Sequence, residues 1–205
     1  MAEVRLRKEM TDIRYVIQAV PGRQKWVKEL QDRLGGCRSF VYYDMCRQPV
    51  KAFIGSLLVV DNDSGHVHLE DDAMLCSRFE VQVEEAVEQY EDSVINFFAG
   101  LSKKREMKPM EVPGRKYLMA QCTWFPKWFP MEFAQWFQEN RQAVLEAAWS
   151  GMDTLVAEFL KATGRKYVHW WPSLVQHRPG VSMIDSKRSK FRQTNHFADD
   201  LAVKV

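Results

Sequence analysis

Short apolar, β-branched runs that alternate with helical segments are the feature that most restricts how this chain can fold. We predict strands over residues 14–20, 39–43, 66–69, 93–98, 117–124 and 167–171. We predict helices over residues 23–34, 49–60, 77–91, 131–140 and 151–163. Strands that alternate with helices predict an α/β fold, in which helices flank a mostly parallel, Rossmann-like central sheet.

One domain accounts for the whole chain of 205 residues, because no linker or internal repeat divides it. Hydrophobic residues make up 46% of the chain and can build a core, and the formal net charge of +2 does not by itself point to a nucleic-acid partner. The N-terminus is charged, and no run of about eighteen apolar residues is present. The four cysteines are widely spaced and typical of reduced thiols. We therefore expect a cytoplasmic protein with no membrane partner.

The residues that follow the strands are the first candidates for a binding site. In open α/β sheets, ligands bind outside the carboxyl ends of the strands. The segments at these positions are Pro21-Gly22-Arg23, Asp44, Glu70-Asp71-Asp72 and residues 172–177.

Glu70-Asp71-Asp72 is the most informative of these segments. Three consecutive acids at the end of a strand repel one another unless a cation compensates them. Oxygen-rich carboxylate sites suit Mg²⁺ or Mn²⁺, often shared with the phosphates of a substrate. An ordinary solvated turn or a helix N-terminus explains the same three residues equally well.

A strand leading into Leu69-Glu70-Asp71-Asp72 resembles the DXD-type metal motif of GT-A glycosyltransferases. Two later segments, Trp149 to Asp153 at the start of a helix and Pro172-Ser173-Leu174-Val175-Gln176-His177, are similar to further landmarks of the same families. The likeness extends over residues 12–185, and small members of this kind also occur in bacteriophages, where some glycosylate modified DNA bases.

The resemblance implies a single GT-A-like domain that binds a nucleotide sugar, most simply a UDP-sugar, together with Mn²⁺ or Mg²⁺. Residues 12–125 would bind the nucleotide sugar, residues 126–185 would hold the acceptor and catalytic groups, and residues 186–205 would form a basic C-terminal segment. Asp72 and His177 would be the metal ligands.

The resemblance also assigns the other site residues. Pro21, Gly22 and Arg23 would lie against the nucleotide, and Asp44 would face its base or ribose. Glu70 and Asp71 would orient the sugar or ribose.

The catalytic base implied by the resemblance is Asp153, which would deprotonate the acceptor hydroxyl. Many relatives carry two adjacent acids here, whereas Thr154 follows Asp153 in this chain. An aspartate at the start of a helix can also serve only as a cap. His177 has a structural alternative as well, because a histidine after a strand is often a hydrogen-bonded structural residue.

Each of three further features has two possible explanations. His66 and His68 point to one face of a strand, which fits either a metal pair or packing against a helix. The aromatic stretch 124–130 fits either an acceptor-binding border or core packing. The basic residues at 103–105 and 187–192 fit contacts with phosphates, from a donor or from DNA, or a solvated charged surface.

The sequence thus favours a metal-dependent glycosyltransferase whose acceptor is a hydroxyl group, with a 5-hydroxymethyl-pyrimidine in phage DNA ahead of a glycan or protein hydroxyl. If the chain is phage-encoded, the host cytoplasm would be its location. Nucleotidyl transfer uses similar carboxylate–metal chemistry, but only Pro21-Gly22-Arg23 stands where its Gly-rich phosphate loop would be. A non-catalytic nucleic-acid-binding module is the third class.

Overall fold

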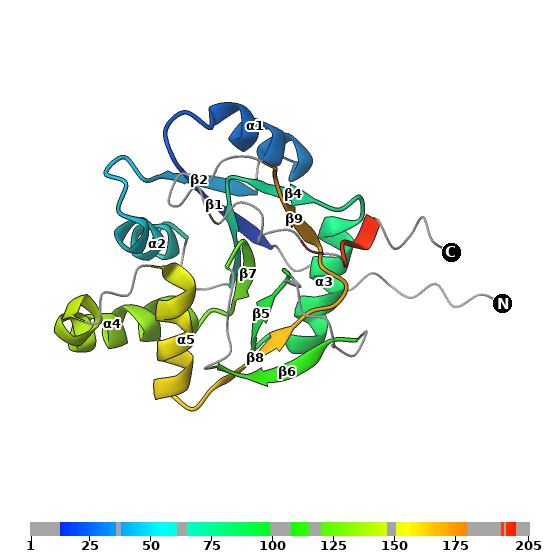
Figure 1. Ribbon diagram of the computed structural model, residues 1–205. Helices are drawn as coiled ribbons and strands as arrows, with labels where there is room; N and C mark the ends of the chain where they lie inside the picture. Colours follow the sequence, from blue (N-terminus) through cyan, green and yellow to red (C-terminus); the bar gives the residue numbers. More distant parts are fainter. Residues whose placement is uncertain are drawn as a thin grey trace.

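A computed structural model describes residues 13–35, 38–60, 65–98, 108–114, 120–146, 151–179, 194 and 196–199 (Figure 1). The strands are β1 (Arg14–Ala19), β2 (Ser39–Tyr43), β3 (His66–Glu70), β4 (Ala73–Leu75), β5 (Val94–Asn96), β6 (Met110–Pro113), β7 (Cys122–Phe125), β8 (Lys166–His169) and β9 (Val175–His177). The helices are α1 (Gln24–Arg33), α2 (Pro49–Leu57), α3 (Phe79–Tyr90), α4 (Phe129–Glu146) and α5 (Met152–Ala162).

The central sheet has seven strands in the order β2-β1-β3-β7-β5-β8-β6. β1 is parallel to β2 and β3, and β5 is parallel to β8. β7 lies antiparallel between β3 and β5, and β6 is antiparallel to β8. The predicted α/β class is confirmed. Most strands of the central sheet share one direction, as predicted, but β6 and β7 run against it, so the sheet is mixed.

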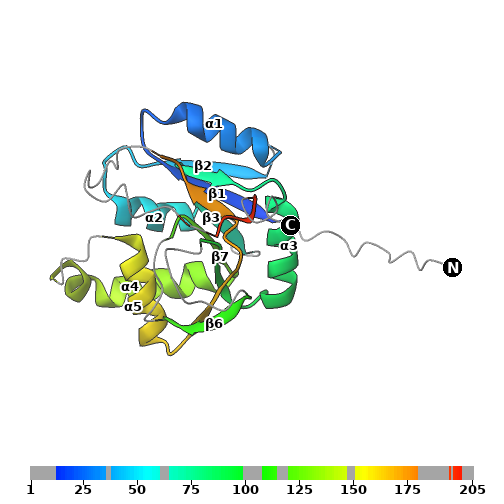
Figure 2. The ribbon, with the colours of Figure 1, turned by 45° about the vertical axis from the view of Figure 1, so that its right-hand side comes forward.

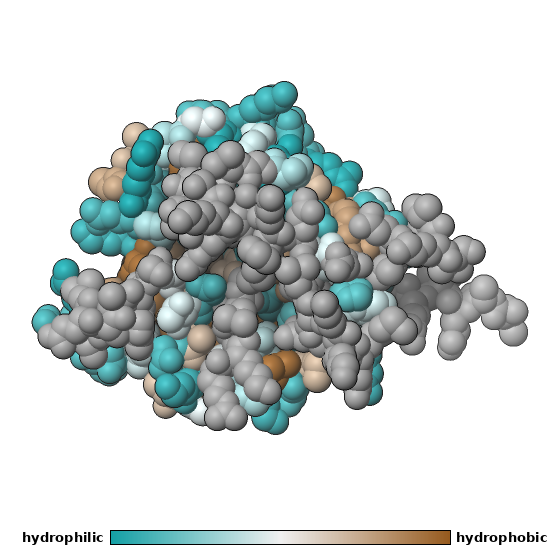
Figure 3. All heavy atoms as spheres, viewed as in Figure 1, coloured by the Kyte–Doolittle hydropathy of each residue, from teal (hydrophilic) through white to brown (hydrophobic). Residues whose placement is uncertain are grey.

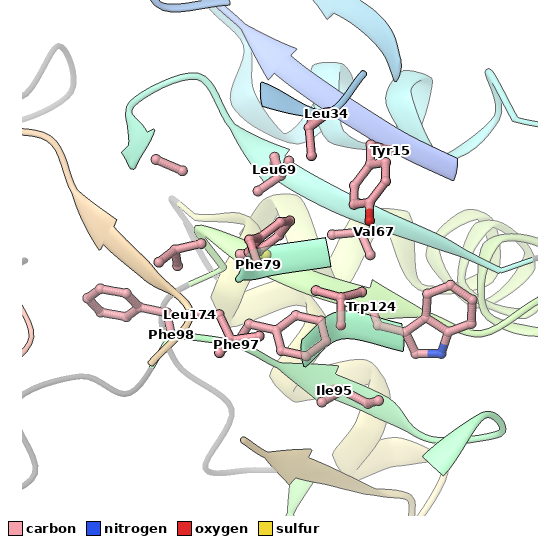
Figure 4. Packing of buried hydrophobic residues seen from close by; sticks show 14 of the residues in the cluster. Tyr15, Leu34, Val67, Leu69, Phe79, Ile95, Phe97, Phe98, Trp124 and Leu174 are labelled. Atoms are coloured by element: carbon pink, nitrogen blue, oxygen red, sulfur yellow. The ribbon is translucent and has the colours of Figure 1, made fainter. Parts of the chain in front are cut away.

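Two hydrophobic cores fill the two faces of this sheet. α1 and α3 cover one face, where Leu30, Phe79 and Val83 belong to one buried cluster with strand residues such as Leu69. Figure 4 shows Phe79 and Leu69 in this cluster. α2, α4 and α5 cover the other face, where aromatic side chains dominate the packing. Figures 1 and 2 show α3 on the side of the sheet opposite to α2, α4 and α5. The result is the three-layer arrangement expected when both faces of a sheet are apolar.

Turn residues fix the ends of several helices at the predicted places. Gly22 has a φ of 98° in the turn before α1, and Gly164 has a φ of 67° just after α5. Such values favour glycine, because a side chain would clash with its own backbone. Pro49 opens α2 at its first position, where a missing N–H costs no hydrogen bond.

Three short strands lie outside the predicted set. β6 lies in a stretch for which no strand is predicted, and β4 and β9 have three residues each. β4 and β9 pair with each other in a separate antiparallel sheet. Runs this short carry no readable periodicity, so only their tertiary pairing defines them.

On the face that Figure 3 shows, the described part of the surface is mainly hydrophilic and its hydrophobic side chains form small separate patches. The exposed large hydrophobic residues are Phe40, Met45, Leu58, Val59, Val81 and Met131. Among the described residues, no helix has both the length and the apolar character that crossing a membrane requires.

Candidate functional site

The candidate site lies at the edge of the sheet where five strands end together. β1, β2, β3, β5 and β8 all run in one direction, because β7 is antiparallel to both β3 and β5. Their carboxyl ends therefore bring the turn at Pro21-Gly22-Arg23, Asp44 and Glu70-Asp71-Asp72 to the same edge. This is the edge at which open α/β sheets bind their ligands.

The small sheet β4–β9 brings His177 to the acidic residues. Ala73, directly after Asp72, pairs with His177, and the backbone N–H of Arg178 donates to the carbonyl oxygen of Asp72 at 2.8 Å. The His177 Nε2 atom consequently lies 3.3 Å from Asp72 Oδ2. Two residues that are far apart in the sequence thus become neighbours through a pair of three-residue strands.

A carbonyl oxygen sets the tautomer of His177. Nδ1 lies 2.8 Å from the carbonyl oxygen of Arg178, which can only accept a hydrogen bond. Nδ1 therefore carries a proton, and Nε2 is the nitrogen directed at Asp72. A neutral His177 presents its lone pair at Nε2, which is the arrangement of a metal-binding histidine.

Arg23 forms ion pairs with both Asp71 and Asp72. Its Nη1 lies 2.5 Å from Asp71 Oδ1 and 2.9 Å from Asp72 Oδ2. The side chains of Asp71 and Asp72 are only 5% and 8% exposed. Asp71 Oδ2 also accepts the backbone N–H of Val20 at 2.9 Å. The acidic pair is therefore buried and compensated by charge, and it is not a solvated acidic turn.

A second arginine completes this side of the site. Arg178 Nη2 lies 2.8 Å from Glu29 Oε2 of α1. The guanidinium groups of Arg23 and Arg178 lie 4.8 Å and 5.2 Å from the ring centre of Trp26, so both make cation–π contacts with the same indole. Arg178, Glu29 and Trp26 are site residues that the sequence analysis missed.

Burial and neighbouring charges shift the pKa values of these groups in different directions. Burial raises the pKa of Asp72, but His177 and Arg23 lower it by more, so the net shift is downward. Burial lowers the pKa of His177, but its contact with Asp72 raises it by more. For Asp71, burial dominates over the Val20 N–H and Arg23, and the pKa is raised. Asp72 is therefore the aspartate whose surroundings favour the ionised form more strongly.

The protein could bind a divalent metal ion here, but it would supply only some of the ligands. Asp72 Oδ1 is buried without a hydrogen-bond partner, and His177 Nε2 likewise makes no hydrogen bond. Within the described ranges, no three His, Cys, Asp or Glu side chains are placed to hold a metal ion among themselves. Asp72 and His177 would thus supply two ligands, and the remainder would come from phosphate oxygens and water, as is common for Mg²⁺.

The other predicted residues occupy separate places around this edge. Asp44 is buried, and its Oδ1 accepts the backbone N–H of Gln48 at 2.9 Å in the turn before α2. Glu70 is the last residue of β3. Pro21 and Gly22 form the turn that presents Arg23.

Asp153 lies in the first turn of α5, which begins after Gly151. Its Oδ1 accepts the backbone N–H of Thr154 at 2.9 Å, so it supports the helix terminus without being the N-cap residue. Because α5 leads through the Gly164 turn into β8, its first turn points toward the carboxyl edge of the sheet. Within the part of the chain that the structure describes, no hydrogen bond or ion pair connects Asp153 to the acidic pair.

The aromatic stretch 124–130 lies at the opposite edge of the sheet. β7 runs antiparallel to β3, so Phe125 pairs with His66 at the start of β3. Trp124, Phe125 and Phe129 are buried, in agreement with the core-packing explanation. Basic residues 103–105 and 187–192 and the landmark residues Trp149 and Ser150 lie outside the described residues.

A buried polar row crosses the sheet near the candidate site. The pairing places His68 beside Thr123, Thr123 beside Asn96, and Asn96 beside His169, on strands β3, β7, β5 and β8. His68 Nε2 also lies 3.1 Å from Gln18 Oε1. The sequence signal for this row is clearest in β5 and β7, where Asn96 and Thr123 are polar residues of otherwise apolar strands.

The same face carries His66, whose two ring nitrogens are buried without hydrogen-bond partners. Both His66 and His68 contact the ring of Phe125, and His68 packs edge-on against Phe53 of α2. This arrangement agrees with packing of the strand against a helix. Burial lowers the pKa of His66 to about 4 and that of His68 to about 3.

No protein-family model matches this sequence, and a comparison with curated proteins finds no significant relative. The function of this protein is therefore inferred from the site itself.

Proposed function

We propose that this protein is a glycosyltransferase that moves a sugar from a nucleotide sugar, with UDP-sugars the first choice, to a hydroxyl acceptor. The observation that carries the proposal is the meeting of Arg23, Asp71, Asp72 and His177 at the carboxyl edge of the sheet. These residues come from the first strand–helix turn, the acidic motif and the Pro-Ser-Leu-Val-Gln-His segment, which are the separate landmarks of the GT-A resemblance.

The nucleotide diphosphate is proposed to lie between α1 and the acidic pair. The first turn of α1 contains no acidic residue, so its free N–H groups and the positive end of its dipole favour an anion. Arg23 precedes this turn, and its planar guanidinium suits bidentate contacts with phosphate. Asp44, at the end of the adjacent strand β2, is proposed to face the base or ribose.

Asp72 and His177 are the residues that would hold Mn²⁺ or Mg²⁺. When bound, the ion would stabilise the negative charge that develops on the departing diphosphate. Glu70 and Asp71 are proposed to orient the sugar or ribose beside it.

The test is a thermal-unfolding screen of UDP, the other nucleoside diphosphates and their sugar conjugates, each with and without Mn²⁺. A ligand that binds only the folded state stabilises it by about 2.7 kcal/mol at a hundred times its Kd. We expect UDP or a UDP-sugar to raise the melting temperature in the presence of Mn²⁺. No shift with any nucleotide, together with a shift with plain DNA, would identify the protein as a nucleic-acid-binding module.

The acceptor side is proposed to use Asp153 as the base that removes the hydroxyl proton. We expect Asp153→Asn to leave UDP-sugar binding nearly unchanged and to slow sugar transfer about a hundredfold or more, because general-base catalysis contributes roughly 10²- to 10⁴-fold. Transfer to hydroxymethylated DNA and to simple glycans would be followed with radiolabelled donor. Glu158→Gln on the same helix is the control, since Glu158 pairs with Lys161. A wild-type transfer rate in Asp153→Asn would exclude the base role.

A further inference from the structure

The position of Arg23 has a consequence for how a metal ion and a nucleotide would bind. One nitrogen, Nη1, contacts carboxylate oxygens of both Asp71 and Asp72. Its side chain is 14% exposed, so the contact is largely shielded from water. Arg23 is thus the counter-ion of the acidic pair.

A divalent ion bound by Asp72 and His177 would have to share this space. Asp72 Oδ2 lies between Arg23 Nη1 at 2.9 Å and His177 Nε2 at 3.3 Å. A cation that reached both Asp72 and His177 would therefore stand next to the guanidinium, and the two positive charges would repel each other strongly in a buried setting. The ion and Arg23 consequently compete for the same carboxylates.

An alternative partner for Arg23 becomes available when a nucleotide binds. Arg23 follows the Pro21-Gly22 turn and directly precedes α1, whose first turn is free of acidic residues. A diphosphate at this helix terminus would offer the guanidinium two negatively charged oxygens in place of the carboxylates. The Trp26 ring already lies beside the guanidinium and would remain a contact during a short displacement.

We propose that Arg23 occupies the acidic pair until donor and metal ion bind together, and that it then transfers to the donor diphosphate. This inference rests on the proposed function. It makes the binding of metal ion and nucleotide cooperative, because the metal ion alone must displace Arg23 without giving it a new partner. By linkage, each ligand then raises the affinity of the other by the same factor.

The test measures Mn²⁺ binding by the electron paramagnetic resonance signal of free Mn²⁺, without nucleotide and with UDP. In the wild type we expect UDP to tighten Mn²⁺ binding at least about tenfold, equivalent to about 1.4 kcal/mol. Arg23→Met should bind Mn²⁺ alone at least about tenfold more tightly than the wild type, and UDP should add little to it.

Two further variants make the result specific. Arg33→Met removes a positive charge from the same helix, where Arg33 contacts the carbonyl oxygen of Cys76, and should leave Mn²⁺ binding unchanged. Arg23→Lys keeps the charge in the protein, but its single ammonium group bridges two carboxylates less well. Arg23→Lys should bind Mn²⁺ more tightly than the wild type, but by a smaller factor than Arg23→Met does. It replaces Arg23→Met in the test if that variant does not fold.

The outcomes separate this inference from the proposed function. If UDP binds the wild type with Mn²⁺, but neither Arg23 variant binds Mn²⁺ more tightly than the wild type, Arg23 does not compete with the metal ion and the inference is overturned, while the glycosyltransferase proposal stands. If no nucleotide binds the wild type, the proposed function and the transfer of Arg23 to a diphosphate both fail. Tighter Mn²⁺ binding by Arg23→Met with loss of the UDP effect supports both.

Discussion

Lowering the pH from 6.5 to 4 is expected to reduce the free energy of unfolding of the wild type by about 3 kcal/mol more than that of His66→Leu. His66 is 1% exposed, and its two ring nitrogens have no hydrogen-bond partner. A protonated imidazolium in this position would be an unpaired buried charge, which is why burial lowers the pKa of His66 to about 4.

The direction of the effect follows from the protonation of His66 in the folded and in the unfolded state. Well above pH 6.5 His66 is neutral both in the folded and in the unfolded chain, so its ionisation does not influence stability. Between pH 6.5 and 4 the unfolded chain takes up a proton that the folded protein does not, and the free energy of unfolding falls by about 1.4 kcal/mol per pH unit. His68, with its pKa lowered to about 3, adds a second contribution of the same sign in the wild type.

Urea unfolding followed by circular dichroism at several pH values between 7 and 4 measures this difference. Other titrating groups are shared by wild type and variant and largely cancel in the comparison. His66→Gln is the matched control, because it also removes the charge but keeps a buried polar group without a partner. We expect both variants to lose the same pH dependence, with His66→Gln less stable than His66→Leu at pH 7. Parallel curves for wild type and His66→Leu would show that the pKa of His66 is the same in the folded and the unfolded protein, so that its burial does not lower it.

The order of the helices and of six strands was predictable because each of these segments carries its own hydrophobic pattern, whereas β4, β6 and β9 are too short to show one. Strand direction was not, since a period of two is the same whichever way a strand runs, and β7 was recognised only as extended. The pairing of Ala73 with His177 joins segments that carry no local signal for each other. That pairing, and not any residue of either segment alone, decides where His177 lies.

The candidate site, like the fold, was predictable only in part. The rule that ligands bind at the carboxyl ends of strands predicts from the sequence that Arg23, Asp71 and Asp72 lie at one edge of the sheet. It could not indicate that Arg23 already pairs with both aspartates, because this contact depends on side-chain directions. Nor could it find Arg178, which reaches the site through the β4–β9 pairing and contacts Glu29 of α1.

Asp72→Asn is expected to weaken the binding of UDP in the presence of Mn²⁺ by about a hundredfold, or about 2.7 kcal/mol. Asn has almost the size of Asp, so the side chain still fits, but the charge that would bind the metal ion is lost. Arg23 keeps its contact with Asp71, so one ion pair of the network remains. A thermal melt without ligand verifies that the variant is folded, because removing one partner from a buried ion pair also costs stability.

Asp32→Asn is the matched control for this change. Asp32 lies on α1 and pairs with Lys28 at the exposed surface, so the same substitution there removes one negative charge without touching the acidic pair. Isothermal titration with UDP in Mn²⁺ should give wild-type affinity for Asp32→Asn and a large loss for Asp72→Asn. Equal affinities in all three proteins would mean that Asp72 does not bind a metal ion with the nucleotide. Arg23 and His177 would then be partners that hold a buried aspartate in the fold, and the acidic motif would have only a structural role.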